Sequence, residues 1–233
     1  MKKVFAAAVL AASLSACTAT YVAKPYVAGP QQITRVAITD DALPEGISAV
    51  EVASVASNFG LIGALIGAGV ENSREDAIEA ALKTVSFDGE ADLERMLTEA
   101  LSANGVEAHV AKSAPRTERK FLVNYPSAAG PVEAYLDVVA TSYGYTSAGH
   151  GQPWRPTADV MVRLVSVPGH KTLLENRIAY NVMNAPRGVI TLSPDPNFTF
   201  NNREEMKADP ARLADGLRAA LRQVATTAAG LMR

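Results

Sequence analysis

Apolar and polar residues alternate in several stretches of the chain, which is the pattern of β-strands with one buried face. We expect strands at residues 33–39, 106–110, 134–147, 157–167 and 172–183. Pro168 and Gly169 are a tight-turn signal between the last two stretches. Strands joined by tight turns pair antiparallel. The second half of the chain therefore predicts an antiparallel meander.

Apolar residues recur at helical spacing in three other stretches. The clearest is residues 92–103, where Leu93, Leu97 and Leu101 share one face and Gly105 follows at the position of a C-terminal cap. Two further helices are expected at residues 71–85 and 210–231. Between these elements, residues 111–131 are expected to form a long loop or a short irregular element, and residues 184–209 a loop-rich stretch.

The order of these elements is strand, helices, strand, meander and terminal helix. Strands grouped in this way favour an α+β fold, with helices packed on one face of a mostly antiparallel sheet. No repeat divides the chain, and about 215 mature residues are enough for one large domain or two small ones. We therefore expect residues 32–233 to form a single α+β domain.

Two places in the sequence present large apolar side chains that suggest an interaction surface. The first is a glycine-rich apolar stretch containing Phe59, Leu61, Ile62, Leu65 and Ile66, in which Gly63 and Gly67 have a spacing that allows close helix packing. It is either core packed under the sheet or a surface for a partner, a lipid or a second copy. The second is Trp154 with Arg155 at a predicted hairpin end, which either caps the core or forms a binding patch.

The first sixteen residues have the pattern of a secretory signal peptide. Lys2 and Lys3 precede an apolar run at residues 4–12, and small residues follow. The run is much shorter than the roughly 20 residues that span a bilayer as a helix. We therefore expect residues 1–16 to be removed on export.

The tetrapeptide Leu14-Ser15-Ala16-Cys17 resembles the lipobox of bacterial lipoproteins at every position. The resemblance implies that the Cys17 sulfur carries a diacylglyceryl group, that cleavage precedes Cys17, and that the new amine is acylated. Residues 17–31 would then be the lipidated cysteine and a tether. By resemblance to the sorting rules of enterobacterial lipoproteins, Thr18 after the cysteine favours the outer membrane over the inner membrane. The alternative is an ordinary signal peptide cleaved after Ala16.

Charge and composition exclude some partners. Removal of Lys2 and Lys3 from the 22 basic residues leaves 20 against 24 acidic residues, a net charge of −4. A nucleic-acid-binding domain needs a basic footprint, so this balance argues against nucleic acid.

Candidate chemistry is sparse. His109, His150 and His170 are not at metal-ligand spacing, and Cys17 is the only cysteine, so no ordinary zinc site is expected. Asp40-Asp41 leaves a carboxylate metal site open, although paired acids in a turn are usually solvated. No phosphate-binding loop, dinucleotide fingerprint or nucleophile elbow is present. We expect no metal, no cofactor and no enzymatic activity.

The order of elements, with Leu93, Leu97 and Leu101 in an L-x-x-x-L-x-x-x-L helix, resembles periplasmic auxiliary lipoproteins of envelope transport systems. Residues 60–85 are also similar to a segment of uncharacterised proteobacterial lipoproteins. The resemblance implies a lipid-anchored, periplasm-facing binding or accessory module for an envelope protein or an apolar ligand. The alternatives are a self-assembling structural lipoprotein and an envelope hydrolase whose Ser–His–acid triad assembles across the fold.

Overall fold

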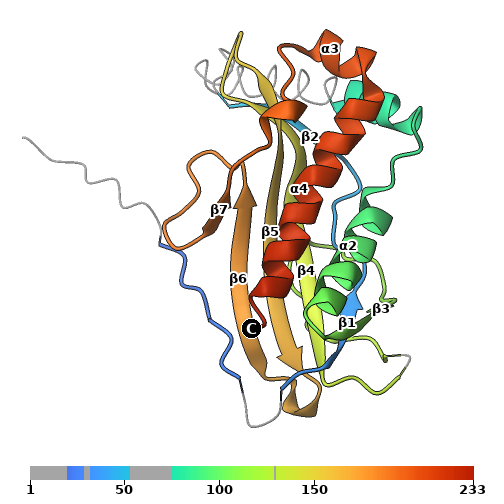
Figure 1. The fold of residues 1–233 in the computed structure, drawn as a ribbon, viewed down its shortest axis with the longest axis vertical. Coiled ribbons are helices and arrows are strands. Elements are labelled where there is room, and N and C mark those ends of the chain that lie inside the picture. Colours follow the sequence, from blue (N-terminus) through green and yellow to red (C-terminus); the bar gives the residue numbers. More distant parts are fainter. Residues whose placement is uncertain (1–19, 29–31, 53–74, 129) are drawn as a thin grey trace, which may run out of the picture.

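The computed structural model describes residues 20–28, 32–52, 75–128 and 130–233. Its centre is a seven-stranded sheet in the order β3-β1-β4-β5-β6-β7, with β2 also beside β4 (Figure 1). The strands are β1 (Arg35–Thr39), β2 (Ser48–Glu51), β3 (Glu107–Ala111), β4 (Ala134–Ser147), β5 (Trp154–Ser166), β6 (Thr172–Tyr180) and β7 (Ile190–Leu192). The helices are residues 75–83, α2 (Gly89–Ala103), α3 (Arg203–Ala208) and α4 (Pro210–Gly230), with short 3-10 turns η2 (Pro168–His170) and η3 (Pro196–Phe198).

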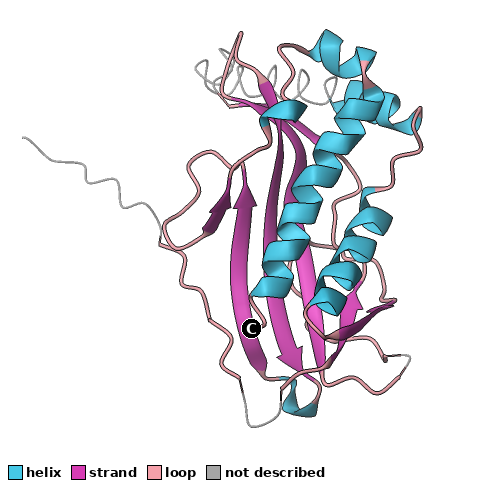
Figure 2. Cartoon of the chain, in the orientation of Figure 1, coloured by secondary structure: helices cyan, strands magenta, loops and turns pink. Residues whose placement is uncertain are grey.

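Helices α2 and α4 lie side by side across one face of the sheet (Figure 2). The leucine face of α2 is buried, as its spacing predicts: Leu93, Leu97 and Leu101 are at most 1 % exposed. They pack in one core with the helix-facing side chains of the long strands, such as Leu136 and Val138 of β4. None of the described helices is both long and apolar enough to cross a membrane.

The sheet is mixed, so the expectation of a mostly antiparallel sheet is wrong. Strands β4, β5 and β6 form the predicted antiparallel meander. However, β1 is parallel to β3 and β4, β2 is parallel to β4, and β7 is parallel to β6. A helical crossover separates β1 from β3, and such a connection returns the chain in the same direction. The strand–helix–strand order at the start of the domain was the signal for parallel pairing.

Strands β1 and β2 line up along the same edge of β4. β1 pairs with the first residues of β4 and β2 with its last residues. The close pairing of β2 with β4 depends on Gly144, which has a φ of +152°. A Cβ at this position would lie 2.0 Å from the carbonyl oxygen of Ser48. β2 has four residues, too few for alternation to reveal it in the sequence.

The second face of the sheet is partly covered by residues 112–128 and 130–132, which we call the strap; Tyr125, Ala128 and Val132 pack there against Ala37, Ala111 and Tyr135. Its main attachment is an ion pair between Arg116 and Asp137 of β4, with Nη2 and Oδ1 2.7 Å apart and side chains 1 % and 0 % exposed. The Leu122 N–H (2.7 Å) and the Tyr125 hydroxyl (3.2 Å) also donate to Asp137. A buried carboxylate needs partners of this kind because its desolvation is costly. The strap is therefore an irregular but anchored element.

Candidate functional site

Most of the site residues expected from the sequence lie outside the described residues. These are Cys17 with the signal peptide before it, and the apolar set Phe59, Leu61, Ile62, Leu65 and Ile66. Trp154 and Arg155 are described. Trp154 is 5 % exposed at the start of β5, where its backbone exchanges two hydrogen bonds with Phe200 (2.7 and 2.9 Å). Arg155 beside it is exposed. Trp154 is thus part of the core, whereas Arg155 meets solvent.

The histidines and the Asp40-Asp41 pair do not form a common site. His109 is on β3, where its buried Nε2 has no hydrogen-bond partner among the described residues. His170 stacks on Tyr125 of the strap at 6.2 Å between ring centroids. Asp40 accepts hydrogen bonds from the backbone and the hydroxyl of Ser113. Among the described parts of the chain, no three His, Cys, Asp or Glu side chains are placed to share a metal ion.

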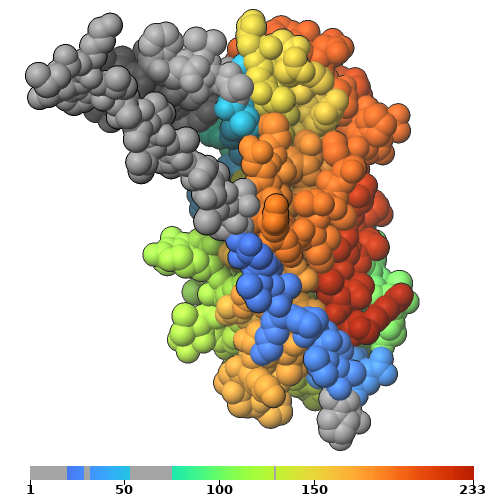
Figure 3. Space-filling model, turned by 90° about the vertical axis from the view of Figure 1, so that its left-hand side faces the viewer, coloured from blue at the N-terminus to red at the C-terminus, as the bar shows by residue number. Residues whose placement is uncertain are grey.

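Residues 20–28, within the stretch expected to be a tether, lie against the body of the domain. The Tyr21 N–H donates to the Arg187 carbonyl (2.7 Å), and the backbones of Lys24 and Glu175 of β6 exchange two hydrogen bonds of 2.8 Å. Figure 3 shows this segment, in blue, running down the surface beside the orange β6–β7 region. We call residues 20–28 the docked segment.

Gly188 makes this docking possible. A Cβ at this position would lie 2.2 Å from the Tyr21 carbonyl oxygen, and the glycine has a φ of +89°. Any other residue would therefore push the docked segment away from the β6–β7 connection. Further along the segment, Tyr26 packs on the main core.

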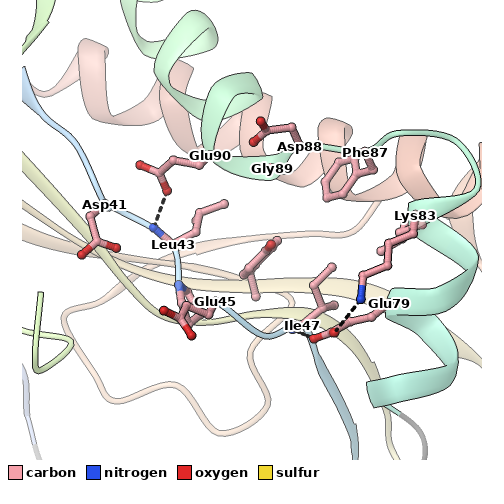
Figure 4. A pocket seen from close by; sticks show the side chains of 13 residues that line it. Asp41, Leu43, Glu45, Ile47, Glu79, Lys83, Phe87, Asp88, Gly89 and Glu90 are labelled. Atoms are coloured by element: carbon pink, nitrogen blue, oxygen red, sulfur yellow. Dashed lines mark hydrogen bonds and ion pairs between the residues drawn. The ribbon is translucent and has the colours of Figure 1, made fainter. Parts of the chain in front are cut away.

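A pocket of about 430 Å³ lies where three parts of the chain meet: residues 41–47 between β1 and β2, helix 75–83, and the start of α2 (Figure 4). Its lining combines apolar side chains with five carboxylates and one lysine. The charged residues are Asp41, Glu45, Glu79, Asp88, Glu90 and Lys83. We call this the acidic pocket.

Backbone groups hold two of the carboxylates in place at the start of α2. Asp88 is the N-cap residue, and its carboxylate accepts a hydrogen bond from the Ala91 N–H (3.0 Å). Glu90 reaches across to the 41–47 segment, where its two oxygens accept hydrogen bonds from the Ala42 and Leu43 N–H groups (both 2.8 Å). Burial raises the pKa of Glu90, and the two N–H groups oppose that rise.

Tyr143 of β4 forms part of the pocket wall. It is 6 % exposed, and its ring and hydroxyl lie against Gly89, where an added Cβ would be 3.1 Å from the hydroxyl oxygen. Burial raises the pKa of Tyr143 to about 12, and the carboxylates of Glu90, Glu79 and Asp88 add to the rise. The hydroxyl therefore keeps its proton at neutral pH and can both donate and accept a hydrogen bond.

The sequence alone did not single out this pocket. Its carboxylates come from three segments that are far apart along the chain, so no local spacing connects them. Asp88 and Glu90 did not indicate a binding site in the sequence, because acidic residues are common at the first turn of a helix for reasons of helix stability alone. The only partial signal was the Asp40-Asp41 pair, of which Asp41 does line the pocket.

One solved structure is similar to this chain over most of its length. No family model matches the sequence, and no curated protein matches it. Among solved structures, the chain is similar to protein XCC0632 from Xanthomonas campestris, described with the family model DUF330. The two share 12% identity, the alignment covers 91% of this chain and 87% of that chain, and the TM-score is 0.42. The neighbour is a proteobacterial protein.

Proposed function

We propose that this protein is a lipid-anchored lipoprotein of the cell envelope that acts as a non-enzymatic binding or accessory module. Lipid chains on Cys17 would hold it at the membrane, with the outer membrane favoured, and residues 32–233 would face the periplasm. Its partner would be another envelope protein or an apolar ligand. Cys17 with two or three acyl chains would give lasting attachment, because a single chain binds a bilayer only weakly.

The observation that supports this proposal is the position of the docked segment. Tyr21 is only four residues after Cys17, and its backbone is already hydrogen-bonded to the body. Four fully extended residues span at most about 14 Å, whereas a free 15-residue tether would span about 50 Å. An anchor on Cys17 would therefore hold the domain close to the bilayer with its β6–β7 side nearest. Such fixed placement suits a module that works on a partner at the membrane surface.

The anchor is tested by intact mass and membrane fractionation of the full-length chain expressed in a proteobacterial host. The wild type should lose residues 1–16, gain the mass of the acyl groups and stay in the membrane fraction. Cys17→Ala should remain uncleaved or unlipidated and leave its normal location. A wild-type chain without added lipid mass, or Cys17→Ala with unchanged mass and fractionation, would show that the anchor is absent.

The partner is tested by co-purification from detergent-solubilised membranes. The same envelope protein should be enriched with the wild type and lost with Cys17→Ala. Recovery of additional copies of this chain alone would instead favour the self-assembling alternative through Gly63 and Gly67. An enrichment that does not depend on Cys17 would contradict a role that requires placement at the membrane.

A further inference from the structure

The acidic pocket has more negative charge than its surroundings neutralise. Asp41 forms an ion pair with Arg119 at 3.1 Å, and Glu79 is 4.0 Å from the largely exposed Lys83. Three carboxylates of the pocket form no ion pair with any described residue: Glu45, Asp88 and Glu90. Neutral backbone N–H groups hold two of them, Asp88 and Glu90, in place. Grouped carboxylates without counter-charge attract a cation and favour its binding.

A second observation, independent of the carboxylates, points to a ligand. The Tyr143 hydroxyl makes no hydrogen bond to any described residue, although 94 % of the residue is buried, leaving the 6 % exposure noted above. Among the described residues, His109 Nε2 is the only side-chain nitrogen or oxygen that is both shielded from solvent and without a hydrogen-bond partner. The Tyr143 hydroxyl oxygen is therefore not shielded from solvent. The hydroxyl therefore still reaches solvent, and the solvent it reaches is in the pocket that Tyr143 lines. No described residue uses its hydrogen-bonding capacity, so the hydroxyl oxygen is available to accept a hydrogen bond from a molecule in the pocket.

The shape and lining of the pocket indicate which kind of cation fits. Figure 4 shows Asp88 and Glu90 on one side and Glu45 and Glu79 on the other, with the side chains of Leu43 and Ile47 between them. The carboxylates are spread around a space of about 430 Å³ rather than gathered at one point. An ammonium or guanidinium group donates several hydrogen bonds in different directions, and an alkyl chain attached to it would contact the apolar floor.

We propose that the acidic pocket binds an organic cation, an ammonium or guanidinium group on an alkyl chain, held by Glu45, Glu90 and the Tyr143 hydroxyl. A lysine or arginine side chain of a partner protein and a small amine share this chemistry. The site is independent of the lipid anchor, so it stands whether or not Cys17 is lipidated.

The test is calorimetric titration of the purified full-length chain in detergent. The probes are N-acetyl-lysine methylamide, pentylammonium, calcium chloride and the uncharged N-acetyl-norleucine methylamide. Glu45→Gln and Tyr143→Phe should each raise the Kd of the two amines about tenfold, and added salt should raise it further. Glu204→Gln, which removes an exposed carboxylate on α3, is the matched control and should leave the Kd unchanged.

The results separate the sources of the cation. Tighter binding of the lysine derivative than of pentylammonium would assign the pocket to a protein side chain, and equal binding would assign it to small amines. Norleucine binding as tightly as lysine, calcium binding in place of the amines, or no binding of any amine would overturn the proposal. Equal weakening by Glu45→Gln and Glu204→Gln would also overturn it, because the attraction would then belong to the whole surface. Unchanged melting of both pocket variants would show that they remain folded.

Discussion

Replacement of Gly216 by alanine should destabilise the protein, although the same change stabilises most helices. Gly216 is in the middle of α4, and a Cβ there would lie 2.1 Å from the hydroxyl oxygen of Tyr145 and 2.9 Å from the Cβ of Phe198. That hydroxyl is fully buried and donates a 3.0 Å hydrogen bond to the Leu213 carbonyl. The new methyl group therefore has to displace either a buried ring or its hydrogen bond.

Three effects determine the change in the free energy of unfolding: one stabilises the variant and two destabilise it. Alanine improves helix propensity by about 1 kcal/mol over glycine. Overpacking a well-filled core costs about 1–3 kcal/mol. Loss of the buried tyrosine hydrogen bond costs about a further 1 kcal/mol. Gly216→Ala should therefore lower the free energy of unfolding by about 1–3 kcal/mol.

Urea denaturation followed by the fluorescence of Trp154, the single tryptophan, measures this change. Gly230→Ala is the matched control in the same helix, because no atom lies within 4 Å of its added Cβ. Tyr145→Phe removes the clashing hydroxyl, so the Gly216→Ala/Tyr145→Phe double variant should be no less stable than Gly216→Ala, with a coupling energy of at least about 1 kcal/mol. A stabilised Gly216→Ala variant, or strictly additive single effects, would refute the reasoning.

Three further changes test other parts of the fold. Arg116→Met should cost about 3–5 kcal/mol in unfolding free energy because it leaves the Asp137 carboxylate buried without its ion pair, and wild-type stability would show that the strap is not anchored there. Leu97→Asp should abolish cooperative melting because it places an unpaired charge at a position that is 1 % exposed, and an unchanged melting curve would mean that this helix face is solvated. Gly188→Ala should release the docked segment and make it sensitive to limited proteolysis, while Gly169→Ala, which has a similar positive φ but open space around the added Cβ, should not; equal cleavage of both variants would attribute the effect to backbone strain.

The sequence predicted the elements whose burial pattern is long and regular. The face of α2 that carries Leu93 and Leu97 is visible because apolar residues recur at helical spacing, and β4, β5 and β6 are visible because apolar residues recur at every second position, although β4 is buried on both of its faces. Strand pairing was harder to predict, since direction depends on the connection rather than on the strand itself. The short strands β2 and β7 have only four and three residues, and they are defined by their neighbours in the sheet.

The acidic pocket and the strap were not predictable for a related reason. Their interactions join residues far apart in the chain, such as Arg116 with Thr39 (3.0 Å) and Glu90 with Ala42. Each of these residues, taken alone, also fits a common structural role that involves no long-range contact. A solvated arginine in a loop and an acidic residue at a helix start have the same sequence pattern as these buried and converging groups.

The position of α4 in the chain has a consequence for the order in which the protein folds. This helix follows every described strand, yet its buried side chains, including Leu213, Leu217 and Leu221, belong to the main core, where α4 packs against α2, β5 and β6. During synthesis, the part of the sheet that α4 covers, over β5 and β6, therefore stays uncovered until this last helix has emerged. Contacts between distant parts of a chain also form slowly. We therefore expect the core of this domain to close only after α4 has been synthesised.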